Sequence, residues 1–159
     1  MTEQRKTAIY PKSGALIAYA HLLYKFAPLD TIGPQMIMDT RNIRILVVDD
    51  EPDVHVLLEK MLGSQGYVVD AAYSADEAFH IMGRSRPDLI ILDLMMPATS
   101  GLMMLEQIRE DDNLRDILVL IVSARDEQAD RIEGLSHGAD DYVSVSYTHL
   151  RAHETKAKL

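Results

Sequence analysis

The stretch IRILVVDDEP, Ile43–Pro52, decides the fold of this chain. Its first six residues form a short apolar run rich in isoleucine and valine, which is typical of a strand buried on both faces. Three acids, Asp49 to Glu51, follow at once, and Pro52 stands where a helix would begin. A buried strand that passes through acids into a helix predicts the first unit of a parallel α/β sheet.

The same strand–helix unit returns along the chain as far as Ser144. Ser74 and Glu77 form a capping-box pattern at the start of the second helix. Short links join the elements, so we expect an α/β protein with a doubly wound, five-stranded parallel sheet and helices on both faces. Further strands are predicted over 67–73, 88–97, 117–124 and 139–144, and helices over 52–66, 74–85, 100–110 and 126–138.

Composition divides the chain into three parts. Of its 159 residues, 47% are hydrophobic and 26% charged, as in globular proteins, and the net charge of -9 argues against nucleic-acid binding. Residues 42–144 carry 21 acidic and 8 basic side chains, whereas the flanks are net basic. We therefore expect one domain over 42–144, an N-terminal extension over 1–41 and a non-native tail over 145–159.

Neither a membrane segment nor a disulfide is expected. The longest apolar stretch, Gly14–Leu29, is interrupted by His21 and Lys25 and falls short of about 18 uninterrupted apolar residues. A signal peptide is a minor alternative, because no small-residue cleavage site follows. The absence of cysteine fits a reducing compartment, so a cytoplasmic location is expected.

Acidic side chains gather where the predicted strands end. Asp49 and Asp50 follow the first strand and Asp93 lies in the third, while Ser123 closes the fourth. Because sites in doubly wound folds lie at the carboxyl ends of the strands, we expect these groups to converge. Converging carboxylates raise one another's pKa unless a cation is present, and hard oxygen ligands on an open rim suit Mg²⁺.

Four motifs carry a family resemblance: ILVVDDEP, PDLIILDLMMPATSG, IVSA and GADDYVS. Together they resemble the response-regulator receiver domain of two-component signalling over Asn42 to Ser144. Asp50 and Asp93 are 43 residues apart, and Asp93 and Ser123 are 30 apart, as in that family. The resemblance implies a flavodoxin-like receiver fold.

The resemblance also implies roles for the acids. Asp93 would be the phosphoacceptor. Asp50, Asp93 and the backbone carbonyl of Met95 would bind Mg²⁺, and Asp49 would act largely through water. Pro97 would help to shape the loop after the acceptor, as would Gly101.

Two further residues would transmit the signal: Ser123 as a switch hydroxyl and Tyr142 as an aromatic whose rotamer follows phosphorylation. The partner would be a histidine kinase or phosphotransfer protein, and the domain would be a signalling module rather than an enzyme. Any output domain would follow Ser144 and be lost from this sequence; a DNA-binding effector, an enzymatic effector and a stand-alone receiver all remain open. The alternative is a phosphorylation-independent pseudo-receiver that acts as an interaction module.

The tail is where the pattern departs from the family. The family's lysine is expected at Val145, and no fifth helix is evident after it. One interpretation is a degenerate receiver, and another takes His149 and His153 as a zinc pair, although no third ligand is evident. A third fits best, because residues 145–155 match the translation of one frame of a common tagmentation sequencing adapter.

The N-terminal residues have two interpretations. Met38 is a plausible start of translation, because the sequence that follows it resembles the usual start of a receiver domain. Residues 1–37 are then either an upstream extension included in error or an amphipathic helix that docks on a partner.

The remaining polar and sulfur-containing residues are expected to have no special role. His55 and His80 are predicted to lie at the surface or at its boundary. The methionines are predicted to fill the core and the loops: Met95, Met96, Met103 and Met104.

Overall fold

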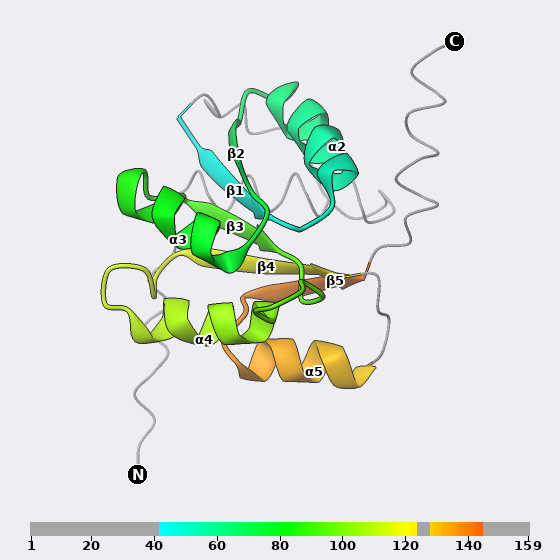
Figure 1. Ribbon diagram of the computed structural model, residues 1–159, viewed down its shortest axis with the longest axis vertical. Coiled ribbons are helices and arrows are strands. Elements are labelled where there is room, and N and C mark those ends of the chain that lie inside the picture. The colour runs from blue at the N-terminus through cyan, green and yellow to red at the C-terminus, as the bar shows by residue number, and fades with distance from the viewer. Residues whose placement is uncertain (1–41, 124–127, 145–159) are drawn as a thin grey trace, which may run out of the picture.

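The computed structural model describes residues 42–123 and 128–144. Strands and helices alternate through this part of the chain, as predicted (Figure 1). The elements are β1 (Arg44–Val48), α2 (Pro52–Gly63), β2 (Val68–Ala72), α3 (Ala75–Arg84), β3 (Leu89–Leu92), α4 (Gly101–Glu110), β4 (Leu118–Ser123), α5 (Gln128–Ser136) and β5 (Asp141–Ser144).

All five strands pair in parallel, in the order β2-β1-β3-β4-β5. This is the flavodoxin-like order, which places a ligand site beside β1 and β3, where the direction of strand addition reverses. In register, Val48 of β1 pairs with Leu92 of β3, the last residue of each strand. The residues that follow these two strands therefore emerge side by side.

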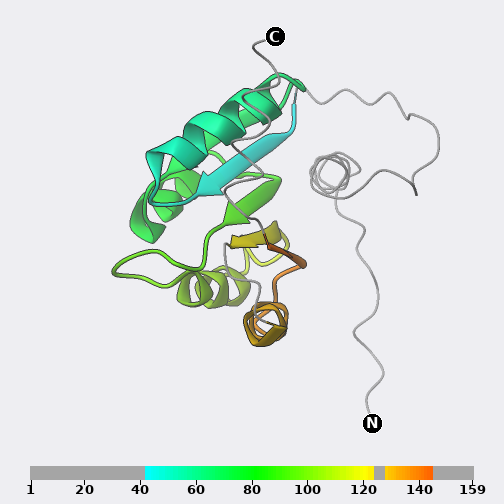
Figure 2. The same cartoon turned by 90° about the vertical axis from the view of Figure 1, so that its right-hand side faces the viewer.

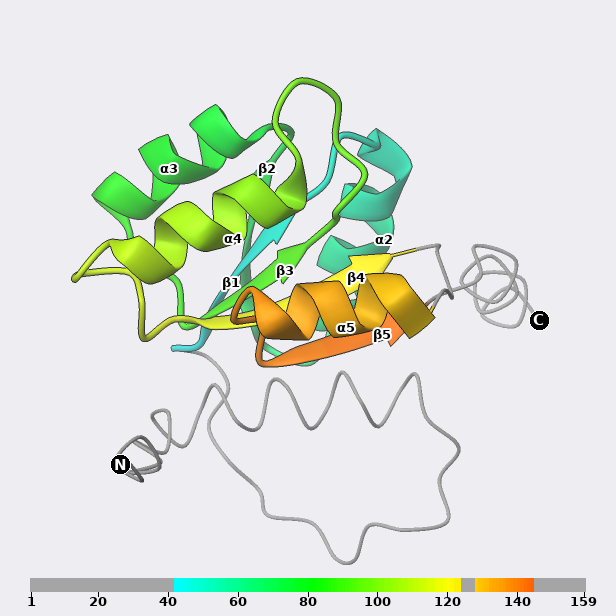
Figure 3. The same cartoon turned by 90° about the horizontal axis from the view of Figure 1, so that it is seen from below.

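Helices cover both faces of the sheet, as predicted (Figures 2 and 3). On one face the strands pack against α3, α4 and α5, and on the other they pack against α2. Successive side chains of a strand point to opposite faces of the sheet. Leu46 and Val48 therefore pack in the core under α3, α4 and α5, whereas Ile45 and Val47 pack in the core under α2. Burial of each of these aliphatic side chains stabilises the folded state by about 1.5–3 kcal/mol relative to leaving it exposed to water.

Side-chain caps fix the helix starts. Ser74 accepts a hydrogen bond from the backbone N–H of Glu77 at 3.2 Å, as the capping pattern predicted. The Glu77 carboxylate accepts from the N–H of Tyr73 at 2.7 Å, one residue before the position that the capping box would use. Ser100 caps α4 by accepting from Met103 at 3.3 Å, and Pro52 opens α2 as expected.

A single arginine ties together the amino ends of β4 and β5. Arg109, near the end of α4, donates to the carbonyl oxygens of Gly138, Ile117 and Arg115 at 2.7, 2.8 and 3.0 Å. It also pairs with Asp140 at 3.0 Å, and Asp140 accepts from the N–H of Val119 at 2.8 Å. Burial lowers the pKa of Arg109 and raises that of Asp140. These contacts join α4 to the segments that precede both strands.

Two predictions, on the end of the third strand and on His55, were wrong. The third strand ends at Leu92 rather than at Pro97, because the chain turns away from β4 directly after Asp93. His55 is buried, with 4% of its surface exposed, although His80 is exposed as predicted. Met96 and Met104 are in the core, whereas Met95 and Met103 are about half exposed.

Several predictions concern residues outside the described range. They include the extension over 1–41, the tail over 145–159 with Val145, and the absent fifth helix. Within 42–123 and 128–144, no helix has the length and apolarity needed to cross a membrane.

Candidate functional site

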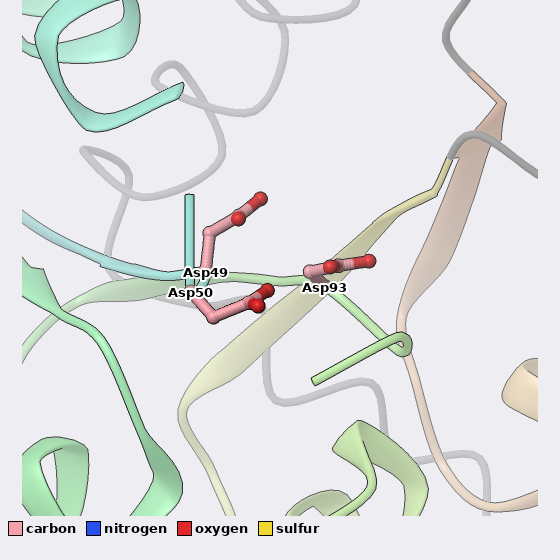
Figure 4. A group of neighbouring side chains, drawn as sticks. All are labelled: Asp49, Asp50 and Asp93. Atoms are coloured by element: carbon pink, nitrogen blue, oxygen red, sulfur yellow. The ribbon is translucent and has the colours of Figure 1, made fainter. Parts of the chain in front are cut away.

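Three aspartates meet at the carboxyl edge of the sheet, between β1 and β3 (Figure 4). Asp49 and Asp50 follow the last residue of β1, and Asp93 follows the last residue of β3. The N–H of Asp93 donates to the carbonyl of Val48 at 2.9 Å, which extends the ladder by one bond. One carboxylate oxygen from each aspartate lies within 4.8 Å of the others, so the structure brings the three predicted acids together.

Burial and repulsion from neighbouring carboxylates make Asp49 and Asp93 costly to ionise. Desolvation raises the pKa of Asp49 to about 6, and the charges of Asp93 and Asp50 add to the rise. A hydrogen bond from the N–H of Glu51 to Asp49 Oδ1, at 2.8 Å, opposes it. Desolvation also raises the pKa of Asp93, with repulsion from Asp50, and the N–H of Met95 opposes that rise.

The donor set fits a hard divalent cation. Asp49 is buried, while Asp50 and Asp93 are partly exposed at the rim. Mg²⁺ is typically bound by one or two carboxylates while it keeps several waters, which a partly open rim allows. A cation here would also relieve the repulsion that raises the two pKa values.

The loop after β3 is shaped tightly around Asp93. The N–H of Met95 donates to Asp93 Oδ1 at 3.2 Å, and the N–H of Gly101 donates to the carbonyl of Leu94 at 3.3 Å. A Cβ on Gly101 would lie 2.8 Å from Leu94 Cα and would collide with the Asp93 carbonyl, so only glycine fits there. In the loop between Leu94 and Gly101, Ala98 has a positive φ of 70°, in a backbone region that non-glycine residues rarely adopt.

Ser123 and Tyr142 lie on the same face of the sheet. Tyr142 pairs in register with Ile121, and both belong to the cluster under α4 and α5. Ser123 is two residues beyond Ile121, so its side chain points to that same face. Both are nearly fully buried, at 2% for Ser123 and 5% for Tyr142. The expected lysine position, Val145, is outside the described residues.

One neighbour of the acids was missed from the sequence. His55 Nε2 lies 2.6 Å from the backbone oxygen of Asp49. A usable signal was present, because His55, Leu58 and Leu62 recur at the i, i+3, i+7 spacing of a buried helix face. A lone polar residue on such a face is predicted to lie at the surface boundary, whereas His55 packs inside the fold.

Comparisons with known proteins agree on one family. The family model described as response regulator receiver domain matches residues 45–152. Response regulator MprA of Mycobacterium ulcerans (strain Agy99) is 40% identical over 102 residues, which is 64% of this chain and 43% of that protein. MprA of Mycobacterium sp. (strain KMS) is 41% identical over 101 residues, 64% of this chain and 43% of that protein. The chain thus spans less than half the length of these curated relatives.

Solved structures give the same result. The N-terminal domain of a response regulator receiver protein from Methanoculleus marisnigri JR1 is 31% identical, with a TM-score of 0.63 over 74% of this chain and 96% of that one. The receiver domain of the Francisella response regulator 1452 is 30% identical, with a TM-score of 0.60 over 65% and 84%. The chain therefore belongs to the response-regulator receiver family of two-component signalling.

Proposed function

We propose that this chain accepts a phosphoryl group on Asp93 from a histidine kinase or phosphotransfer protein, and that the modification changes its interaction surface. The observation that carries the proposal is the cluster of Asp49, Asp50 and Asp93, with ligand oxygens within 4.8 Å, in a receiver domain. Asp93 stands at the point where β3 ends and the tight loop begins, which fixes its backbone against β1.

Mg²⁺ is the proposed cofactor, held by the Asp50 and Asp93 carboxylates and the backbone carbonyl of Met95, with Asp49 acting largely through water. When bound, it would neutralise charge on the phosphoryl oxygens during transfer. The chain's own contribution is to hold hard oxygen donors at one edge before the metal arrives. Met95 is 52% exposed, which is consistent with a position on the open rim beside the acids.

In the proposed transfer, a carboxylate oxygen of Asp93 forms a bond to phosphorus while the bond between phosphorus and the donor's imidazole nitrogen breaks. The product is an acyl phosphate, and the donor histidine leaves with the electron pair of the broken bond. The N–H of Met95, 3.2 Å from Asp93 Oδ1, orients the carboxylate for this step. In the metal-free chain, burial and repulsion raise the pKa of the Asp93 carboxyl. A bound cation would lower this pKa again and favour the ionised carboxylate, which is the form that acts as the nucleophile.

Ser123 and Tyr142 are the proposed switch pair. Their side chains share the sheet face covered by α4 and α5, so a movement of Ser123 toward a new phosphoryl oxygen changes the packing beside Tyr142. Gly134 of α5 lies in the same contact region, since a Cβ there would be 2.6 Å from the Ile121 side chain. Phosphorylation would thus bias the surface of α5 and β5.

The test is modification by a small phosphodonor. The full chain is incubated with acetyl phosphate and Mg²⁺, and intact mass spectrometry counts the added phosphoryl groups. We expect one group on the wild type, none on Asp93→Asn, and one on the control Asp53→Asn, an exposed acid in the first turn of α2. An unmodified wild type, or a modified Asp93→Asn, contradicts the proposal.

The pseudo-receiver is the second candidate, and Val145 is the observation that favours it. Valine supplies no charge where the family's lysine would pair with the phosphoryl group. Under this alternative the folded chain takes no phosphoryl group with Mg²⁺ present. The acetyl phosphate test of the wild type separates the two candidates. If the wild type is not modified, Val145→Lys then shows whether the remaining residues of the site are competent, because modification of that variant requires them.

A further inference from the structure

His55 connects α2 to the acidic site through one short hydrogen bond. Its Nε2 lies 2.6 Å from the backbone oxygen of Asp49. A carbonyl oxygen only accepts, so Nε2 carries the hydrogen and donates it. The residue is 4% exposed, which shields this bond from water.

The carbonyl that His55 binds belongs to the peptide between Asp49 and Asp50. Because a peptide group is planar, fixing this oxygen fixes the plane from which both acids project. The N–H of Asp49 is held on the other side by the carbonyl of Ala72, at 3.1 Å. The Asp49 carboxylate is held by the N–H of Glu51, at 2.8 Å. His55 thus completes a set of bonds around Asp49.

The imidazole ring is itself fixed by Tyr73, which directly follows β2. The two ring centroids are 4.3 Å apart, with the planes tilted by 48°. The other ring nitrogen, Nδ1, is buried and has no hydrogen-bond partner among residues 42–123 and 128–144. An unpaired buried nitrogen is unfavourable, so stability alone would favour an apolar side chain at this position. The histidine is better explained by the bond that its Nε2 makes.

We propose that His55 is a positioning residue that orients Asp49 and Asp50 for metal binding, with Tyr73 holding its ring. This inference rests on the proposed Mg²⁺ site. Bonds to the groups that support metal ligands commonly account for a 10–100-fold effect on metal affinity. Because His55 acts on the backbone rather than on a carboxylate, the lower end of this range, about tenfold, is expected.

The test measures Mg²⁺ affinity by calorimetric titration of the full chain with magnesium chloride, and thermal unfolding of each variant separately. His55→Gln keeps a donor at the position of Nε2, whereas the shorter amide of His55→Asn does not reach the carbonyl. His55→Leu removes the donor altogether. Leu58→Ala is the matched control, since Leu58 is also buried on α2 but packs in the sheet core.

We expect Mg²⁺ to bind about tenfold more weakly to His55→Leu and His55→Asn, and within about threefold of wild type to His55→Gln. Leu58→Ala should unfold at a lower temperature and keep the wild-type affinity. If His55→Leu does not fold, the pair His55→Asn and His55→Gln decides. Equal affinities within that pair overturn the inference.

The same titration measures the Mg²⁺ affinity of the wild type and of Asp93→Asn, and so tests the proposed metal site itself. Asp93→Asn should bind Mg²⁺ more weakly, because it removes a proposed ligand. A wild type that binds no Mg²⁺ refutes the metal site and the positioning role together. A wild type that binds Mg²⁺, with His55→Asn unchanged, refutes only the role of His55. Tyr73→Ala should weaken binding and Tyr73→Phe should not, because the phenylalanine ring still packs on the imidazole; a loss in Tyr73→Phe contradicts the part assigned to stacking.

Discussion

Replacing Asp49 with asparagine should stabilise the metal-free fold. Asp49 is 6% exposed and lies beside two other carboxylates, so its ionised form is unfavourable in the folded chain. Asparagine has nearly the same shape and no charge. Its Oδ1 can still accept from the N–H of Glu51, the 2.8 Å bond that holds the loop.

The magnitude follows from the pKa of this carboxyl. It lies at about 6 in the folded chain, against 3.8 as the ordinary value. At 1.36 kcal/mol for each factor of ten, this difference makes ionised Asp49 destabilising by about 3 kcal/mol at neutral pH. The buried amide of asparagine loses part of that gain through imperfect hydrogen bonding. We expect the free energy of unfolding to rise by about 1–2 kcal/mol.

The pH dependence has a defined sign. A folded-state pKa above the unfolded one means that the folded chain binds more protons between about pH 4 and 6. The contribution of Asp49 to wild-type stability therefore falls as the pH rises through this window. The advantage of Asp49→Asn should be full at neutral pH and disappear toward about pH 4.

Urea unfolding followed by circular dichroism, with EDTA present, measures both quantities. Asp112→Asn is the control, because this carboxylate is exposed and far from the cluster in sequence, and it should change stability by less than about 0.5 kcal/mol. Mg²⁺ at about a hundred times its dissociation constant should add about 2.7 kcal/mol to the wild type and less to Asp49→Asn. An Asp49→Asn chain no more stable than wild type at neutral pH without metal refutes the reasoning.

Four further changes test the packing of the fold. Gly101→Ala should destabilise by about 2–3 kcal/mol, because its Cβ would collide with backbone, whereas Gly83→Ala on α3 meets open space and should stabilise by up to about 1 kcal/mol. Ala98→Gly should stabilise slightly, by about 0.5 kcal/mol, since it relieves the positive φ. Arg109→Met should destabilise by about 3 kcal/mol, because it leaves carbonyl oxygens without donors. Thermal unfolding ranks the four variants, and a reversed order of the two glycine variants would contradict the assigned geometry.

The sequence predicts the fold because the residues of each strand and helix specify that element locally. The apolar runs, the capping serines and the short links each specify one element, and parallel pairing then brings the strand ends to one edge. That is why the sequence predicts that Asp49, Asp50 and Asp93 lie together, as the structure shows. The end of the third strand was missed because apolar residues continue after Asp93, and only the turn of the chain shows where pairing stops.

Contacts that depend on the docking of whole elements could not be predicted. His55 reaches a carbonyl only six residues away, yet the approach depends on how α2 sits on the sheet. Arg109 reaches groups up to 31 residues away, and nothing in the sequence around it marks a partner. The exposed Met95 shows the same limit, because residue type alone does not say which methionine points outward.

The two edges of the sheet carry different parts of the free energy. At the amino edge, Arg109 supplies hydrogen bonds that stabilise the fold in any ligand state. At the carboxyl edge, the raised pKa values of Asp49 and Asp93 record instability that a bound cation would remove. A change at Arg109 should therefore lower the unfolding temperature without altering Mg²⁺ affinity. Asp49→Asn should raise the unfolding temperature of the metal-free chain and weaken Mg²⁺ binding. If the Arg109 variant and Asp49→Asn both lower the unfolding temperature and both weaken Mg²⁺ binding, the two edges are coupled through the sheet. Their separate roles, argued from these contacts, would then be wrong.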